Sequence, residues 1–441
     1  MGDKFVVTSE HTCKPKPNLK LNLLLHDKAK QIAKEDKFES AVNLLRPLLD
    51  DPALLDDPSA PGPNLRHVAW TLYTTRKKLR PRNPKDLFFT VDQDHIPEGF
   101  LRADVVADHS EKHRERHLIF CAEKQLKFLK SAKCWFLDRT CKLIKTPFVE
   151  LISIHGAYSI SPKKDLRQAP LLYVFMSSRK AKDYSIVFEK IVEMLGHEHC
   201  VEEIVFNFRK SVLQALEQVL PSVYLYGCPF QWSQTVLRKF KSLGLIPLYD
   251  KCENVQKLCW RVLALHLLPG EEIPKAFHSL QAKARKMTLS EKNNRLLLQF
   301  FKYVEETWIQ NSLWTPDRWS VFMQPVMRPN ADAWHNHLIA SLRGHNLETE
   351  AIDFYNLVLA LYNRLNSEWP KGELGFLSQK QQTAILKKQT VKCLSFCLYK
   401  YWDSYDEEDI NAIDLLKLCA AVYIKNCNFD FVYEGETNVN V

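Results

Sequence analysis

Asp138 is the side chain whose position most clearly points to chemistry. It interrupts an apolar run, Cys134–Lys142, that is typical of a buried strand. Aspartate is disfavoured in strands, and an unpaired carboxylate is costly to bury, so we interpret Asp138 as part of a site for a hard cation. The alternative is that Arg139 or another cation simply pairs with it.

Other clusters of reactive side chains favour structural roles. His197–Cys200 (HEHC) contains metal-ligand types, but it joins an apolar helix face to a strand, which favours a polar connection. Cys393 and Cys397 are four residues apart and share one helix face, as in a buried core stripe. The sequence contains no glycine-rich phosphate loop and no convincing Ser/His/Asp arrangement, so other enzyme classes lack support.

The elements that would hold Asp138 in place follow one another closely from Ala132 onward. Hydrophobic periodicity predicts strands over Cys134–Lys142, Phe148–Tyr158, Leu171–Met176, Val201–Phe208 and Val223–Cys228, and helices over Tyr184–Leu195 and Lys210–Leu220. Short connections suit antiparallel pairing of the first three strands, and helical crossovers suit parallel pairing of the others. This order predicts an α/β fold with a ribonuclease-H-like, mixed five-stranded sheet flanked by helices.

Helical patterns dominate the remainder of the chain. They predict helices over Asp27–Leu49, Asn254–Leu268, Glu291–Ile309 and Thr349–Asn366. An acidic, proline-rich stretch, Asp50–Asn64, indicates a linker. We therefore predict five parts: an N-terminal appendage (1–64), a basic, partly helical DNA-binding candidate region (65–131), the sheet-containing core (132–250), an all-helical insertion (251–325) and a helical C-terminal region (326–441).

Five blocks, in the same order along the chain, resemble the Mutator-like (MULE) transposase family. They are Trp135–Thr140 (WFLDRT), Phe148–His155 (ending SIH), Val201–Phe208, Gly227–Gln234 (GCPFQWSQ) and Arg328–Asn336 (RPNADAWHN). The resemblance implies a DDE-type transposase core, metal-dependent cleavage and transfer of DNA strands, and location in the nucleus.

In this family three carboxylates converge on two magnesium ions, which clamp the attacking and leaving oxygens of a phosphodiester. The matching positions in this chain are Asp138, Asn207 and Asp332. His335 lies about one turn after Asp332 on the same face of a predicted helix. The resemblance thus implies magnesium or manganese as the cofactor, held weakly if at all by Asp138 and Asp332.

These positions depart from the family pattern in ways that predict impaired catalysis. Asn207 replaces an aspartate, and its amide oxygen brings no negative charge to a cation. Arg209 stands where the family often has an acid, and Arg139 replaces a small glycine and would crowd the site. Asp332 is one methylene shorter than the family's glutamate. The alternatives are that Asn207 is a strand-end turn former and Asp332 a helix cap.

Two further motifs bear on metal binding. Cys228 matches the cysteine of a Cys-His pair near the family's active site, but Gln231 replaces the histidine and cannot transfer protons or ligate soft metals. The alternative is a buried Cys228 that packs as a small hydrophobe. His11–Pro17 (HTCKPKP) resembles the last ligand segment of a FLYWCH zinc finger, truncated here; a structural zinc site needs four ligands, so we expect no zinc.

Charge points to a polyanionic partner. The formal net charge is +9, and one basic run stands out. The candidate DNA-binding residues in it are Arg76, Lys77, Lys78, Arg80, Arg82 and Lys85. We expect DNA as the partner, protein partners for the helical regions, a homo-oligomer as a further option, and no membrane association, because every apolar run is far shorter than the roughly 20 residues of a spanning helix. Twelve scattered cysteines predict a reducing compartment.

Two alternatives stand beside a catalytically impaired relic that retains DNA and/or protein binding. An active transposase would need another carboxylate, and the nearest, Glu202 and Glu203, precede Asn207 by five and four residues on one strand, about 13 Å or more away. The other alternative is a protein-interaction module that binds no nucleic acid.

Overall fold

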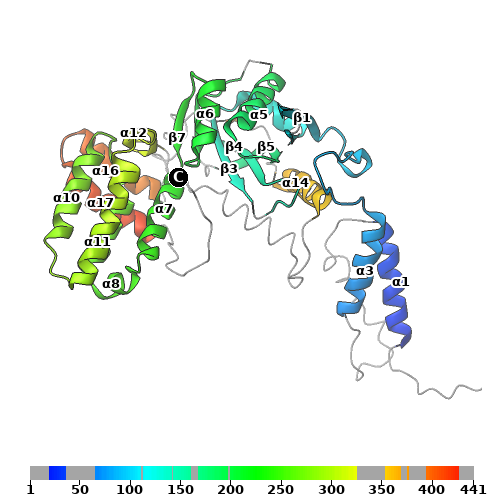
Figure 1. Ribbon diagram of the computed structural model, residues 1–441, viewed down its shortest axis with the longest axis horizontal. Coiled ribbons are helices and arrows are strands. Elements are labelled where there is room, and N and C mark those ends of the chain that lie inside the picture. The colour runs from blue at the N-terminus through cyan, green and yellow to red at the C-terminus, as the bar shows by residue number, and fades with distance from the viewer. Residues whose placement is uncertain are drawn as a thin grey trace, which may run out of the picture. The chain divides into compact units, whose positions relative to one another are not determined.

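The computed structural model describes residues 19–35, 65–110, 113–141, 143–159, 167–196, 199–324, 353–368, 375–376 and 394–426 (Figure 1). The chain divides into two compact units, one of residues 1–84, 90–96 and 337–360, and one of residues 85–89, 97–336 and 361–441. Asp332, His335 and the His11–Pro17 motif lie outside the described residues, so the expectations about them stay predictions.

The first unit contains two helices, α1 (Leu19–Glu35) and α3 (Leu65–Leu79), that pack together. Apolar residues three and four positions apart on each helix form their seam, because such residues share one helix face. The buried members are Leu25, Ala29, Ala33, Val68 and Leu72. His26 Nδ1 lies 2.6 Å from Thr71 Oγ1 across the same seam. The helix that the sequence predicted from Asp27 begins earlier in the structure, at Leu19.

The second unit contains a mixed sheet. Its strands are β1 (Leu101–Ser110), β2 (His113–Phe120), β3 (Cys134–Thr140), β4 (Glu150–Ser159), β5 (Arg167–Met176), β6 (Glu203–Phe206), β7 (Tyr224–Gly227) and the short β8 (Gly375–Phe376). The strand order is β1-β2-β5-β4-β3-β6-β7, with β8 beside β4. β6 is parallel to β3 and β7, and the other pairs are antiparallel. The predicted mixed sheet is confirmed, but the prediction of five strands is wrong, since seven lie on one path.

The two strands missing from the prediction, β1 and β2, form a hairpin that extends the sheet beyond β5. Their charged side chains pair across the strands: Arg116 Nε donates to Asp104 Oδ1 at 2.8 Å, and Arg114 Nε lies 2.9 Å from Asp108 Oδ1. Such cross-strand pairs stabilise a hairpin. Part of the region predicted to be basic and partly helical, residues 65–131, is therefore a strand hairpin with paired charges.

Two helices, α5 (Ala181–Met194) and α6 (Lys210–Val219), lie side by side on one face of the sheet (Figure 1). Each follows a strand and leads to the next parallel strand, as a crossover helix does. Ser185 Oγ of α5 donates to Gln218 Oε1 of α6 at 3.1 Å. Their apolar faces, with Tyr184, Phe188 and Leu213 fully buried, join the main core. This packing defines one covered face of β3 and β4.

After β7 the described elements are helical up to residue 324. They are α7 (Pro229–Ser242), α8 (Ile246–Lys251), α9 (Glu253–Leu263), a 3-10 turn (Leu265–Leu267), α10 (Glu272–Arg285), α11 (Glu291–Val304), a π-helical turn (Glu305–Ile309) and α12 (Pro316–Trp319). Later come α14 (Phe354–Glu368), α16 (Leu394–Asp406) and α17 (Ala412–Asn426). Trp402 Nε1 of α16 donates to Leu267 O at 2.8 Å, so the C-terminal helices complete this helical part. No helix in the described stretches is both long and apolar enough to cross a membrane.

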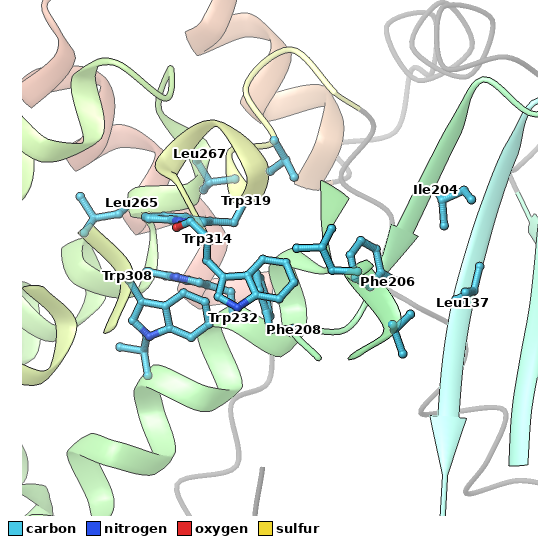
Figure 2. Close-up of a cluster of buried hydrophobic side chains, with 14 of the residues drawn as sticks. Leu137, Ile204, Phe206, Phe208, Trp232, Leu265, Leu267, Trp308, Trp314 and Trp319 are labelled. Atoms are coloured by element: carbon cyan, nitrogen blue, oxygen red, sulfur yellow. The ribbon is translucent and has the colours of Figure 1, made fainter. Parts of the chain in front are cut away.

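An aromatic cluster joins the sheet to these helices (Figure 2). We define it as Phe206, Phe208, Trp232, Trp308, Trp314 and Trp319, all of them buried. The rings of Phe208 and Trp308 lie 4.7 Å apart in an edge-to-face arrangement, and Trp232 stacks on Trp319 at 4.7 Å with an interplanar angle of 12°. Because Phe206 and Phe208 flank Asn207, this packing holds the chain in place at the end of β6.

Candidate functional site

Asp138 and Asn207 lie side by side at the ends of two parallel strands. Phe136 of β3 pairs with Val205 of β6, so two residues further along each chain Asp138 stands level with Asn207. Neighbouring strands are about 5 Å apart, and residues two apart share one face. The side chains are 7% and 6% exposed, respectively. The structure thus brings together the two described members of the predicted set of three.

The same pair lies at the topological switch point of the sheet. From β3 the chain builds β4 and β5 on one side, then crosses to β6 and β7 on the other. In open α/β sheets ligands bind beyond the carboxyl ends of the strands at such a point. The place is therefore one where a ligand is expected on topological grounds alone.

A polar stripe continues from this pair across the sheet. Asp138 pairs with Ser153 of β4, which pairs with Tyr173 of β5, and Ser153 Oγ lies 2.8 Å from His155 Nε2. All of these side chains are buried. We define the polar stripe as Asn207, Asp138, Ser153 and Tyr173. Apart from Asp138 and Asn207, Ser153 and His155 also had a signal in the sequence, as part of the block ending SIH.

Arg139 does not pair with Asp138 and does not crowd it, contrary to both expectations for this residue. Adjacent residues of a strand point to opposite faces. Arg139 therefore lies on the face covered by α5, where its Nη1 donates to Glu150 Oε2 at 2.8 Å. The sequence already contained this alternation, but Glu150 as the partner follows only from the pairing of β3 with β4.

Glu150 is the centre of a charged cluster on the helix-covered face. Its side chain is 1% exposed and accepts hydrogen bonds from Arg139 Nη1 and from Tyr184 Oη, the latter at 2.6 Å. Arg179 Nε lies 3.5 Å away, and Arg179 Nη2 donates to Val149 O at 2.8 Å. Burial, and then the charge of Glu150, raise the pKa of Tyr184, so its hydroxyl stays protonated and donates.

Arg209 completes this group, which we define as the guanidinium cluster: Arg139, Arg179 and Arg209 around Glu150 and Tyr184. Burial lowers the pKa of Arg209, and the neighbouring charge of Arg139 lowers it further. The Arg209 Nε atom is buried and has no hydrogen-bond partner in the described part of the chain. The described neighbours of Arg209 are those of the helix-covered face, so its predicted repulsion of cations at Asp138 and Asn207 stays a prediction.

The described residues do not fit a two-magnesium centre. Asp138 supplies one negative charge, and Asn207 Oδ1 is a neutral oxygen that is buried and accepts no hydrogen bond from any described residue. Two divalent ions need several carboxylates to balance their charge. Among the described residues, no group of three or more His, Cys, Asp or Glu side chains is placed to hold a metal ion. Asp332 lies outside the described residues, so the described part of the site supplies one carboxylate, Asp138.

Cys228 and Gln231 lie next to the end of β7. Cys228 is the buried residue before α7, and its backbone N donates to Phe206 O at 2.8 Å. Gln231 is half-buried in the first turn of the helix. Gly227, just before them, is required sterically, because a Cβ there would lie 2.2 Å from Phe208 Cε1. This block thus supports the aromatic cluster and the carboxyl ends of β3, β6 and β7, which we call the carboxyl edge of the sheet.

The predicted DNA-binding run is only partly exposed. Lys77, Lys78, Arg82 and Lys85 are exposed. Arg76 is 3% exposed on α3, and Arg80 Nη1 lies 3.7 Å from Asp353 Oδ2. Basic residues in the last turn of α3 also interact favourably with the helix dipole, which is a structural reason for their presence.

Glu203 is not a replacement carboxylate for the site. It pairs with Cys134 and Tyr224 at the amino ends of these strands, four residues before the position of Asn207. Burial, and then the charge of Glu202, raise its pKa to about 7. The candidate residues that the sequence did not reveal are Glu150, Arg179 and Tyr184, which gather near Arg139 only in the folded chain.

Comparison with known proteins supplies no further assignment, because no protein-family model and no curated protein sequence matches the chain.

Proposed function

We propose that this protein derives from a Mutator-like transposase, that its core is ribonuclease-H-like, and that it is catalytically impaired and binds DNA in the nucleus. The observation that carries the proposal is the adjacency of Asp138 and Asn207 at the switch point of the sheet. An antiparallel strand trio extended by two parallel strands on the side of β3 is the arrangement that a ribonuclease-H-like core requires. The added β1–β2 hairpin lies at the far edge, away from β3.

The charge balance at this edge supports impairment rather than activity. Asn207 contributes no charge, and Arg209 introduces a half-buried cation two residues later. Both changes oppose the binding of divalent ions. An active transposase remains the competing function, and it would require carboxylates beyond those described at this edge.

The decisive experiment restores the missing charge. Isothermal titration with manganese should show little binding to the wild type and clear binding to Asn207→Asp, because the added carboxylate lies beside Asp138. The double variant Asn207→Asp with Asp138→Ala should lose that gain. Glu203→Gln is the matched control, since it changes a carboxylate on the same strand at its amino end. Tight binding of two ions by the wild type, or magnesium-dependent DNA cleavage abolished by Asp138→Ala, would overturn the proposal that catalysis is impaired.

Salt dependence separates DNA binding from a protein-interaction module. Contacts to phosphates make affinity fall steeply as salt rises, whereas apolar protein contacts do not. We expect DNA affinity to fall by about tenfold or more between about 50 and 200 mM salt. Absence of DNA binding at the lower salt concentration would favour the module.

A further inference from the structure

On the helix-covered side of the carboxyl edge of the sheet, opposite the face of Asp138, the described cations outnumber the described acids. Two guanidinium groups, those of Arg139 and Arg179, pair with the single carboxylate of Glu150, and the charge of Arg209 acts on the same group of residues. In the two segments that lead into α5 and α6, residues 176–183 and 206–213, the only acid is Asp183. Its side chain is fully buried, 3.4 Å from His117 Nε2. Lys180, Lys182 and Lys210 are exposed in the same segments, so the outer surface there is cationic.

Both crossover helices begin at this edge with a cation as the capping residue. Lys180 caps α5 and Arg209 caps α6, and neither side chain accepts a hydrogen bond from the helix. Helix N-termini carry partial positive charge and favour Asp, Asn, Ser or Thr. Cations at two adjacent N-termini oppose folding locally, and such conflicts are expected at functional sites.

At the same place, Arg209 has a hydrogen-bond donor without an acceptor among the described residues. No described residue accepts a bond from its buried Nε, and the Nε of Arg139 is in the same condition. Buried donors without acceptors are rare and costly in folded proteins. An anion with several oxygens could be bound at this place by the exposed guanidinium group of Arg179 and the first N–H groups of the helices.

We infer that the guanidinium cluster, with the amino ends of α5 and α6, binds a backbone phosphate of a nucleic-acid strand. Planar guanidinium groups and helix N–H groups are the usual partners of phosphate oxygens. The flanking lysines Lys180, Lys182 and Lys210 could contact the neighbouring phosphates of a strand, which a free phosphate ion would not use. The inference takes its ligand class from the proposed function, but it depends on neither the metal site nor the basic run of α3.

The test compares two arginines of the cluster with a matched arginine elsewhere. Fluorescence anisotropy measures binding of labelled single-stranded and duplex DNA at several salt concentrations. Arg209→Gln and Arg179→Gln should each weaken binding about three- to tenfold and lower the slope against salt by about one. Arg295→Gln makes the same charge change on the exposed side of α11 and should stay within about twofold of the wild type. Arg139 is left intact because Glu150 depends on it.

A second readout keeps the result independent of folding defects. Inorganic phosphate should raise the Tm of the wild type above its value in chloride of equal ionic strength, and Arg209→Gln should lose this rise. Arg179, 41% exposed, is the variant most certain to fold. The inference is overturned if both cluster variants bind DNA as Arg295→Gln does, or if phosphate stabilises a wild type that binds no DNA. A failed manganese titration affects only the proposed metal-site relic and leaves these outcomes unchanged.

Discussion

The aromatic cluster and the guanidinium cluster both begin at the end of β6, yet opposite physical effects dominate them. Phe206 and Phe208 pack against a group of buried tryptophans, and burial of each ring removes apolar surface from water. One residue later, Arg209 enters a site with more cations than acids. The first region gains free energy from burial, while the second retains charges that the described residues do not balance. We therefore expect the aromatic cluster to hold the chain in place and the guanidinium cluster to bind the inferred phosphate.

Asn207 lies between the two regions and depends on both. Its neighbours on either side are held by Trp308 and Trp314, so its position beside Asp138 is fixed by packing that has no chemical role. Changes to the aromatic cluster should therefore act on stability. At the carboxyl edge, changes to the arginines should act on binding, whereas loss of the acid that balances them should act on stability. Four substitutions test what the different parts of the fold contribute to stability.

The largest expected effect is in the aromatic cluster. Trp232→Ala removes a fully buried ring that stacks on Trp319, so we expect a loss of about 3 to 5 kcal/mol in the free energy of unfolding. Trp70→Ala is the matched control, because Trp70 is 64% exposed on α3, and it should cost less than about 0.5 kcal/mol. Urea unfolding followed by circular dichroism measures both. Equal losses would show that the cluster is not the main source of stability.

Next comes the buried acid at the centre of the guanidinium cluster. Glu150→Gln leaves Arg139 and Arg179 without their counter-ion, so we expect a loss of about 3 kcal/mol in unfolding free energy. Glu202→Gln removes an acid whose ion pair with Lys133 is exposed, and it should have no measurable effect. If Glu150→Gln were as stable as the wild type, the cluster would not need its acid and the contrast between the two regions would fail.

The third prediction concerns acid sensitivity within the helical part. Burial lowers the pKa of His266 to about 3 from its usual 6.5. The unfolded chain therefore takes up this proton first as pH falls, so the stability present above pH 6.5 is lost progressively between about 6.5 and 3. Between pH 7 and 5 the wild type should lose about 2 kcal/mol more than His266→Phe.

Urea titrations at the two pH values measure this difference. His278→Gln is the control, because His278 is exposed on α10, and it should keep the acid sensitivity of the wild type. Equal pH dependence in His266→Phe and the wild type would assign the acid loss to other groups.

The smallest effect is expected at Gly227, where the two regions meet. An added Cβ would lie 2.2 Å from the Phe208 ring, so Gly227→Ala should cost about 1 to 3 kcal/mol by displacing it. Combined with Phe208→Ala, the same change should cost much less, because the clash is then absent. Thermal unfolding of the two single variants and the double variant gives the coupling. Simple additivity would mean that Gly227 acts through its backbone instead.

Much of the sheet could be predicted from the sequence because strand and helix periodicity is a local property. The order of elements from β3 to β7 is observed as predicted, with bounds shifted by a few residues. The hairpin of β1 and β2 was not predicted, because its charged side chains find their partners only across the two strands. Asp138 could be singled out because a carboxylate within an apolar run is conspicuous in any fold.

Tertiary structure alone decided what surrounds each of these side chains. Arg139 and Arg209 read in the sequence as substitutions that damage a metal site, but the fold directs Arg139 to Glu150 and brings Arg179 and Tyr184 beside them. The aromatic cluster likewise unites residues from 206 to 319. The reason is physical: periodicity tells which face a side chain occupies, whereas its partners come from distant segments that only strand pairing and helix packing bring near. The sequence by itself thus determined the order of the elements and the residues of interest, and the packing determined which charges are balanced.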